Sequence, residues 1–245
     1  MNQKSRFLIR ESFNLSGRNF KKVLLPTAIY TLIGIVLFIL SSFMDDTEMV
    51  RITYTAVGVI TVCWLYSSTI LNQYEIFKKD SVIKVNYIPM YYRVLPTIFF
   101  QSILFILFVI IYSAIVSLKT EEFLLQLLTL IYYTILGIIL IIPFTILYIQ
   151  VSRYTNTRLA NIIVLVVLLL VTPVFYVGAS LPGIVKNILL LNPFYYVIES
   201  IEMSSVGIPW SSNRLLQDVL FISEMLLIYL WIMVGYKKLK VDFIS

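Results

Sequence analysis

Long unbroken runs of apolar residues are the feature that most restricts how this chain can fold. The run IIVLVVLLLV at 162–171 does not alternate apolar and polar positions, as the strands of a membrane barrel would. Across the chain 13% of residues are charged, whereas a soluble domain carries about 25%. Inside a bilayer every backbone polar group must be bonded within its own element, so these runs predict membrane-spanning helices.

We predict an all-α integral membrane protein, with one transmembrane domain over residues 1–245. A helix needs roughly 20 apolar residues to cross a bilayer. Six segments meet this requirement, at about 23–43, 52–72, 96–118, 123–149, 159–178 and 215–236. The segment 5–22 mixes aromatic and basic residues, which predicts an N-terminal interfacial helix ahead of the first span.

The Lys and Arg residues predict the orientation of these spans. Of the 19 basic residues, all but Arg51, Lys119, Lys186 and Arg214 fall in segment 1–22, in loop 73–95, after the fourth span or at the C-terminus. Cytoplasmic segments carry the excess of positive charge, so both termini of this multi-pass protein are expected in the cytoplasm. The frequent use of Ile, Lys, Asn and Tyr is typical of an AT-rich bacterial genome, so we expect the bacterial cytoplasmic membrane. The net charge of +6 then indicates contact with the lipid bilayer and its anionic headgroups, not with nucleic acid.

The inventory of reactive side chains argues against catalysis by this chain. There is no histidine and a single cysteine, Cys63, so we expect no metal site and no disulfide. The glycine-rich loop that binds ATP phosphates is missing from the sequence. We therefore predict that the chain is not an enzyme and holds no cofactor of its own.

The longest inner loop, residues 73–95, has an amphipathic pattern. Apolar Ile76, Phe77 and Ile83 are interspersed with charged Glu75, Lys78, Lys79, Asp80 and Lys84. This pattern predicts a helix lying under the membrane that ends at Pro89. The residues alone leave two interpretations open, a plain interfacial helix and a docking helix for a cytoplasmic partner.

The segment LPGIVKNILLLNPFYYVIESIEM at 181–203 is apolar but interrupted. Pro193 divides it into two pieces that are each too short to cross, and it disfavours a helical conformation at Asn192. We predict a broken re-entrant hairpin at 179–204, on the outer side between spans five and six. Glu199 and Glu202 are three positions apart on its second helix, and we expect both to face an external vestibule.

Two carboxyl groups fall inside the sixth predicted span. Asp218 follows Arg214 by four positions, which favours an ion pair on one helix face. Glu224 lies near mid-span, where a carboxylate is costly. We expect it to be protonated or to bond a polar side chain such as Gln101 or Gln126, and a structural role is favoured over a transport role.

In organisation the chain resembles the permease subunits of ABC-2 type exporters. The loop EIFKKDSVIKVNYIP at 75–89 is similar to the family's acidic, basic and apolar run ending in proline. The run TPVFYVGASLPGIVKNILLLNPFYYVIESI at 172–201 resembles the family's fifth-span exit, where LPG leads to an Asn-Pro pair and an aromatic helix. The segment FNLSGRNFKKVLLP at 13–26 lacks the basic Leu-Gly-Trp signature of the glycopolymer-exporting branch.

The resemblance implies the membrane subunit of an ATP-driven exporter for an amphiphilic cargo, such as an antimicrobial or toxin-like peptide, a drug or a lipid. Such a permease pairs with an identical or homologous permease and with two copies of a cytoplasmic ATP-binding subunit, which holds the ATP and Mg²⁺. One alternative is export of a lipid-linked cell-wall polymer, teichoic acid or polysaccharide. Another, of a different class, is a non-transporting membrane immunity or scaffold protein.

The resemblance also assigns roles to residues of this chain. Coupling to the ATPase is expected at Glu75, Ile76, Phe77, Lys78, Lys79, Asp80, Ile83 and Lys84. The translocation path is expected at Tyr30, Thr172, Phe175 and Tyr176. The outer gate is expected at Leu181, Pro182, Asn192, Pro193, Phe194, Tyr195 and Glu199.

Overall fold

The computed structural model of the chain is helical in the part that it describes. The described residues are 20–41, 43, 46–77, 90–120, 125–154, 159, 161–164, 166, 189, 191–207 and 214–241. Within them no strand occurs, and the main helices are α2 (Phe20–Ser41), α3 (Asp46–Phe77), α5 (Met90–Thr120), α6 (Leu127–Tyr154), α9 (Pro193–Ser205) and α10 (Leu215–Val241). An all-α protein, as predicted, is what these residues form.

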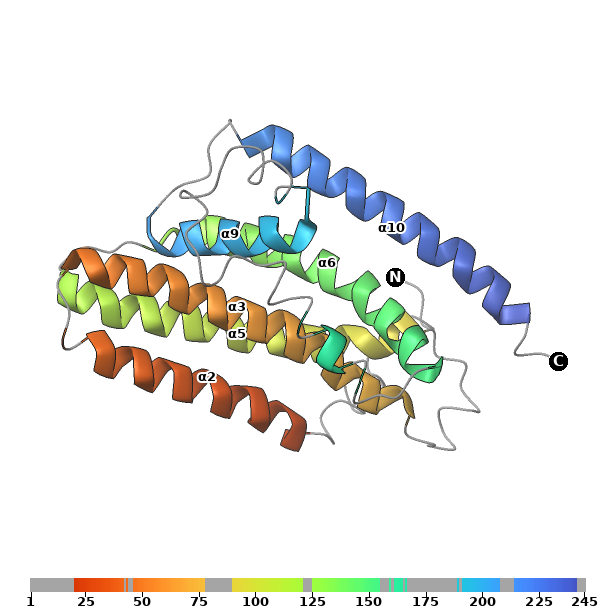
Figure 1. Ribbon diagram of the computed structural model, residues 1–245, viewed down its shortest axis with the longest axis horizontal. Helices are drawn as coiled ribbons and strands as arrows, with labels where there is room; N and C mark the ends of the chain where they lie inside the picture. The colour runs from red at the N-terminus through yellow and green to blue at the C-terminus, as the bar shows by residue number, and fades with distance from the viewer. Residues whose placement is uncertain are drawn as a thin grey trace, which may run out of the picture.

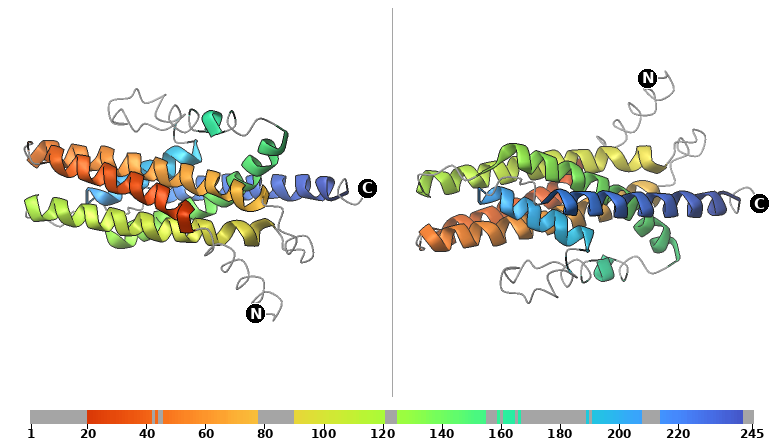
Figure 2. Two further views of the ribbon diagram at one scale, coloured as in Figure 1. Left: turned by 90° about the horizontal axis from the view of Figure 1, so that it is seen from below. Right: turned by 90° about the horizontal axis from the view of Figure 1, so that it is seen from above.

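The long helices lie lengthwise beside one another. α2, α3, α5 and α6 reverse direction from one to the next, and α10 runs the same way as α6 (Figure 1). α3 packs against α2, α5 and α6, and α10 packs against α6 and α9. The short helix α9 packs against both α3 and α6 (Figures 1 and 2). α2 begins toward the end of the bundle at which α3, α6 and α10 finish.

Four of the helices are long and apolar enough to cross a membrane. The qualifying stretches are Val50–Ile70, Val94–Ala114, Leu127–Ile149 and Leu215–Ile232. They fall within the predicted second, third, fourth and sixth spans or overlap them closely, so the chain has the character of a membrane-embedded protein. In α2, at the predicted first span, the described apolar stretch Thr27–Val36 is shorter. The predicted fifth span, 159–178, lies mostly outside the described residues, as does the predicted interfacial helix at 5–22 apart from its last three positions.

Two helices extend beyond the apolar runs that predicted them. α3 continues to Phe77, and α5 already begins at Met90. Hydrophobicity marks the part of a helix that lipid surrounds, whereas backbone hydrogen bonding can continue into water beyond it. Residues 73–77, which we assigned to a separate amphipathic helix, are therefore the last turn of α3, and residues 78–89 lie outside the described part.

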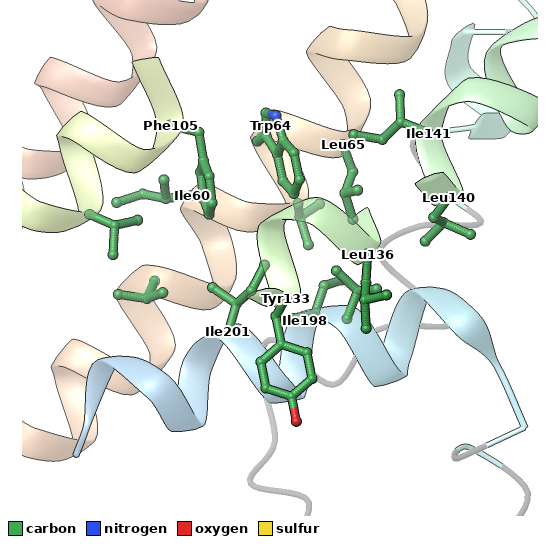
Figure 3. Packing of buried hydrophobic residues seen from close by; sticks show 14 of the residues in the cluster. Ile60, Trp64, Leu65, Phe105, Tyr133, Leu136, Leu140, Ile141, Ile198 and Ile201 are labelled. Atoms are coloured by element: carbon green, nitrogen blue, oxygen red, sulfur yellow. The ribbon is translucent and has the colours of Figure 1, made fainter. Parts of the chain in front are cut away.

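The core is centred on Trp64 of α3, where α3, α5, α6 and α9 meet (Figure 3). Its ring stacks on Phe105 of α5, with the centroids 4.5 Å apart and the planes at 12°. The indole N–H donates to the Ser102 hydroxyl at 3.2 Å. On the other side α6 comes close enough that a Cβ atom on Gly137 would lie 2.6 Å from the Trp64 ring. The indole is thus packed on both sides and its polar atom is satisfied.

Several of the buried hydroxyl side chains in this bundle bond within their own helix. Thr61 donates to the Val57 carbonyl at 2.7 Å, and Thr134 donates to the Leu130 carbonyl at 2.8 Å. Such back-bonding satisfies the hydroxyl without a partner from another helix. Polar residues within the apolar helices therefore need not be parts of a site.

Candidate functional site

Helix α9 begins at the Asn-Pro pair, as predicted. Asn192 has extended backbone angles, φ −93° and ψ 114°, and Pro193 occupies the first helical turn. The Asn192 side-chain oxygen accepts from the Phe194 N–H at 3.2 Å, which makes Asn192 the N-cap. Proline suits this position because the first N–H groups of a helix have no intrahelical partner. Three of the predicted gate residues therefore form the start of α9.

Most of α9 is buried within the bundle. Its buried residues are Tyr195, Tyr196, Val197, Ile198, Glu199, Ser200, Ile201, Glu202, Ser204 and Ser205. With 13 residues it is too short to cross a bilayer, as we expected for the second half of the hairpin. At its far end the Ser204 carbonyl accepts from the backbone N–H of Gln126, just before α6, at 2.9 Å. The other predicted gate residues, Leu181 and Pro182, lie outside the described part.

The two glutamates of α9 do not face water, which corrects our expectation of an external vestibule. Glu199 is 4% exposed and Glu202 is 0% exposed. Both lie on the side of α9 that meets α3, and Oε1 of Glu202 sits where a Cβ atom of Gly58 would be. Their spacing correctly predicted that the two residues share a face of α9. That face, however, is covered by α3.

Glu202 is the one described carboxyl group whose oxygens are both buried without a hydrogen bond of good geometry. Neither of its oxygens has a hydrogen bond of good geometry, although the Tyr54 phenol of α3 lies close enough to interact. Burial raises the pKa of Glu202 well above its usual range, Tyr54 opposes the shift, and nearby Glu199 adds to it. A carboxyl group in such surroundings favours the neutral, protonated form.

The start of α10 is tied to α9 through polar side chains. Arg214 donates to the Ser200 hydroxyl at 3.2 Å and also reaches the Met203 sulfur. The buried Asp218 accepts a hydrogen bond from the Tyr196 hydroxyl. We expected Arg214 and Asp218 to pair along their own helix, whereas the contacts seen here join α10 to α9.

Glu224 does not bond either of the partners that we suggested. Gln101 is fully buried on α5, and both atoms of its amide group lack a hydrogen bond in the described structure. Gln126 is hydrogen-bonded through its backbone: its N–H donates to the Ser204 carbonyl, and its carbonyl accepts from the Leu130 N–H. Glu224 itself is partly exposed on α10, one helical turn from the buried Phe221.

Tyr30, predicted to line the path, is buried inside the bundle. It is 0% exposed, shares a hydrogen bond of 3.3 Å with Ser67, and packs against Phe108 with ring centroids 5.5 Å apart. Its side chain therefore fills the contact between α2, α3 and α5 and faces no open path in this conformation. The other predicted path residues, Thr172, Phe175 and Tyr176, lie outside the described part.

The predicted coupling residues lie at and beyond the end of α3. Glu75, Ile76 and Phe77 form its last turn. Lys78, Lys79, Asp80, Ile83 and Lys84 lie outside the described residues. Among the side chains that the structure describes, no three Asp, Glu or Cys residues come together as a possible metal site.

Our sequence analysis missed Gly58 and Tyr54 as partners of α9. A lone glycine within an apolar helix is a signal, because small residues in membrane helices let a neighbouring element come close. Gly58 and Gly137 both have this role, with Glu202 and Trp64 respectively against them. Identifying the neighbour needed the three-dimensional arrangement.

The comparisons with known proteins leave the family open. No protein-family model matches this chain, and no curated protein matches it. The described residues define the class: they form a helical protein of membrane-embedded character, in which four of the described helices are long and apolar enough to span.

Proposed function

We propose that this chain is the membrane-spanning subunit of an ATP-driven exporter of the ABC-2 type, moving an amphiphilic cargo out of the cell. A separate cytoplasmic subunit would hydrolyse the ATP. The observation that carries the proposal is α9. It is a short helix that begins at an Asn-Pro break, cannot cross a bilayer and packs among the spanning helices directly before α10. The hairpin that the family resemblance implies has such a second half.

The end of α3 supports a docking role for the segment that follows it. α3 runs for 32 residues, while the apolar stretch within it ends at Ile70. About two turns of α3 therefore extend past the apolar stretch, and at 1.5 Å per residue the seven residues from 71 to 77 span about 10 Å. In the sequence Lys78 and Lys79 follow directly, and the family resemblance implies that they contact the cytoplasmic subunit.

Co-purification with an ATP-binding subunit tests the proposal. The tagged chain would be isolated from its native membrane in mild detergent, and bound proteins would be identified by mass spectrometry. We expect an ATP-binding subunit in the parent sample and its loss, with loss of export, in the double variant Lys78→Glu, Lys79→Glu. Reversing two charges at a docking site should disrupt an interface that depends on charge complementarity.

Arg51→Glu is the matched control, because Arg51 is an exposed basic residue at the opposite end of the same helix. We expect this variant to retain the ATP-binding subunit. If no such subunit accompanies the parent chain and the lysine variant behaves like the parent, the exporter proposal is wrong. A non-transporting immunity or scaffold protein would then be the better description.

A further inference from the structure

The interface between α9 and α3 contains a buried carboxyl group whose negative charge would be poorly stabilised there. Glu202 is 0% exposed, and neither of its oxygens accepts a hydrogen bond in the described structure. Its Oε1 atom lies directly against the backbone of Gly58. The Tyr54 phenol is the one neutral donor from the described residues that acts on it, and an ionised carboxylate with so few partners is destabilised out of water, so the docked geometry favours the neutral form.

The backbone of Gly58 restricts what can bind Glu202 at Oε1 while α9 is docked. Gly58 occupies the space on the Oε1 side, which leaves no room there for a hydrated cation. A proton needs no such room, removes the charge, and gives the carboxyl group an O–H that can donate to the Tyr54 hydroxyl beside it. The Oε1 side therefore favours a proton over a hydrated cation.

We propose that Glu202, with Glu199 and Tyr54 beside it, is a proton-binding site whose occupancy decides whether α9 stays docked between α3 and α6. Docking takes up one proton from water, and undocking releases it as the carboxyl group becomes hydrated. This assigns α9 a movement controlled by pH, independent of the identity of any cargo.

Among the described side chains, those that act on Glu202 are Tyr54 and Glu199, and neither supplies a counter-charge. α3 presents Tyr54, and α9 itself presents Glu199 and Tyr195. α6 presents Tyr133, whose ring packs edge-on against Tyr196. On α10, Arg214 and Asp218 contact residues 196, 200 and 203 of α9, a different face from that of residues 195, 199 and 202.

The direction of the pH dependence follows from the raised pKa of Glu202 in the docked state. Below about pH 4.3, the ordinary value for Glu, both states are protonated and docking is at its strongest. As the pH rises above that value the undocked state ionises, so docking weakens by about tenfold per pH unit until the docked pKa is reached. Acid therefore holds α9 in place and alkali releases it.

Cysteine accessibility in the full chain tests this. In a Cys63→Ser background, Val197→Cys places a thiol on a fully buried position of α9, while Leu191→Cys places one at a position that is 59% exposed. Both would be labelled in lipid nanodiscs with a water-soluble methanethiosulfonate, from about pH 5 to about pH 8. The rate at 197 divided by the rate at 191 cancels the pH dependence of the reagent.

We expect this ratio to rise with pH at up to about tenfold per unit, and to be low and flat when Glu202→Gln is added, because glutamine is neutral throughout. Glu224→Gln, which removes a carboxyl group elsewhere, should keep the slope. A flat ratio in the chain that retains Glu202, or a slope that survives Glu202→Gln, would overturn the proposal.

Hydrogen exchange covers the case in which Glu202→Gln fails to fold. In the unaltered chain, exchange of α9 amides, corrected for the intrinsic pH dependence, should accelerate with pH relative to that of α6 amides. Equal behaviour of the two helices would contradict the proposal. The result does not depend on the proposed exporter function, since a failed co-purification with an ATP-binding subunit would leave it untouched.

Discussion

Gly58 and Gly137 are the positions where side chains from other elements come closest to a helix backbone. Glu202 lies against the first, and Trp64 lies against the second. Both contacts are made inside the bundle, where the touching groups are fully buried and have little freedom to move aside. At each of these two glycines the absence of a Cβ atom lets a neighbouring side chain come close. The two glycines therefore determine how closely α3, α6 and α9 approach one another.

Gly58→Ala should destabilise the protein, because its methyl group would overlap Oε1 of Glu202. We expect a loss of about 1–3 kcal/mol, the usual range for overpacking a core. The midpoint of thermal unfolding in detergent, followed by tryptophan fluorescence, would measure it. Gly34→Ala is the control, since nothing lies within 4 Å of the added atom there, and it should leave the midpoint unchanged or raise it.

The origin of the loss can be checked with a second change. Combining Gly58→Ala with Glu202→Ala removes the group that the new methyl would strike. The double variant should therefore be more stable than the sum of the two single effects, as expected for residues in direct contact. Simple additivity would mean that Glu202 is not what makes the glycine necessary.

At the scale of elements, α9 is held from both ends and from the side. The Asn192 cap fixes its start, the Gln126 N–H binds its last turn, and Arg214 and Asp218 of α10 contact its flank. These contacts surround the site that contains Glu202. Movement of α9 would have to break the contacts with Gln126, Arg214 and Asp218, whereas the Asn192 cap belongs to α9 itself and can be removed without touching them.

Asn192→Ala should loosen the first turn of α9. Loss of an N-cap side chain costs about 1 kcal/mol, which corresponds to roughly fivefold faster opening of the capped amides. Hydrogen exchange of residues 194–196 would report this change. Asn192→Asp, which keeps an oxygen acceptor at the same place, should preserve protection, and an equal loss in both variants would show that the cap is not the cause.

The start of α9 could be predicted from the sequence, whereas its surroundings could not. Proline restricts its own backbone and that of the preceding residue, so Asn192 and Pro193 predict a helix start from local rules alone. Whether Glu199 and Glu202 meet water or protein depends on α3, which precedes them by more than a hundred positions. Their spacing indicates only that they share a face. The error about the vestibule came from supposing that a carboxyl pair on a short outer helix must be hydrated.

The difference between local signals and contacts among distant segments also explains which features of the bundle interior could be predicted. Apolar length predicted the four helices able to span, because that requirement is a property of each segment by itself. It could not predict that Tyr30 bonds Ser67 within the bundle, or that Arg214 contacts Ser200 on α9. Those pairings depend on which faces of the helices meet.

At the scale of the whole molecule, successive helices from α2 to α10 alternate in direction (Figure 1). α2 ends, α3 begins, α5 ends and α6 begins toward the same end, where Phe43 is 83% exposed. The distribution of Lys and Arg in the sequence predicts that this end faces outward.

Cysteine labelling of whole cells would test that orientation. In a Cys63→Ser background, a membrane-impermeant maleimide should label Phe43→Cys in intact cells. It should label Ser245→Cys, at a C-terminus predicted to be cytoplasmic, only after the membrane is permeabilised. The opposite pattern would reverse the orientation, and labelling of both positions in intact cells would exclude this topology.

The position of α9 in the chain has a consequence for how the protein is made. Its seat is formed by α3 and α6, which leave the ribosome first, whereas α10, which clamps its side, follows it. α9 can therefore pack against α3 and α6 as soon as it is synthesised, without first being exposed to lipid. Glu202 would then be buried before α10 is made, and Arg214 would bind Ser200 and Met203 on another face of α9 afterwards, so the order of synthesis also serves as an order of assembly.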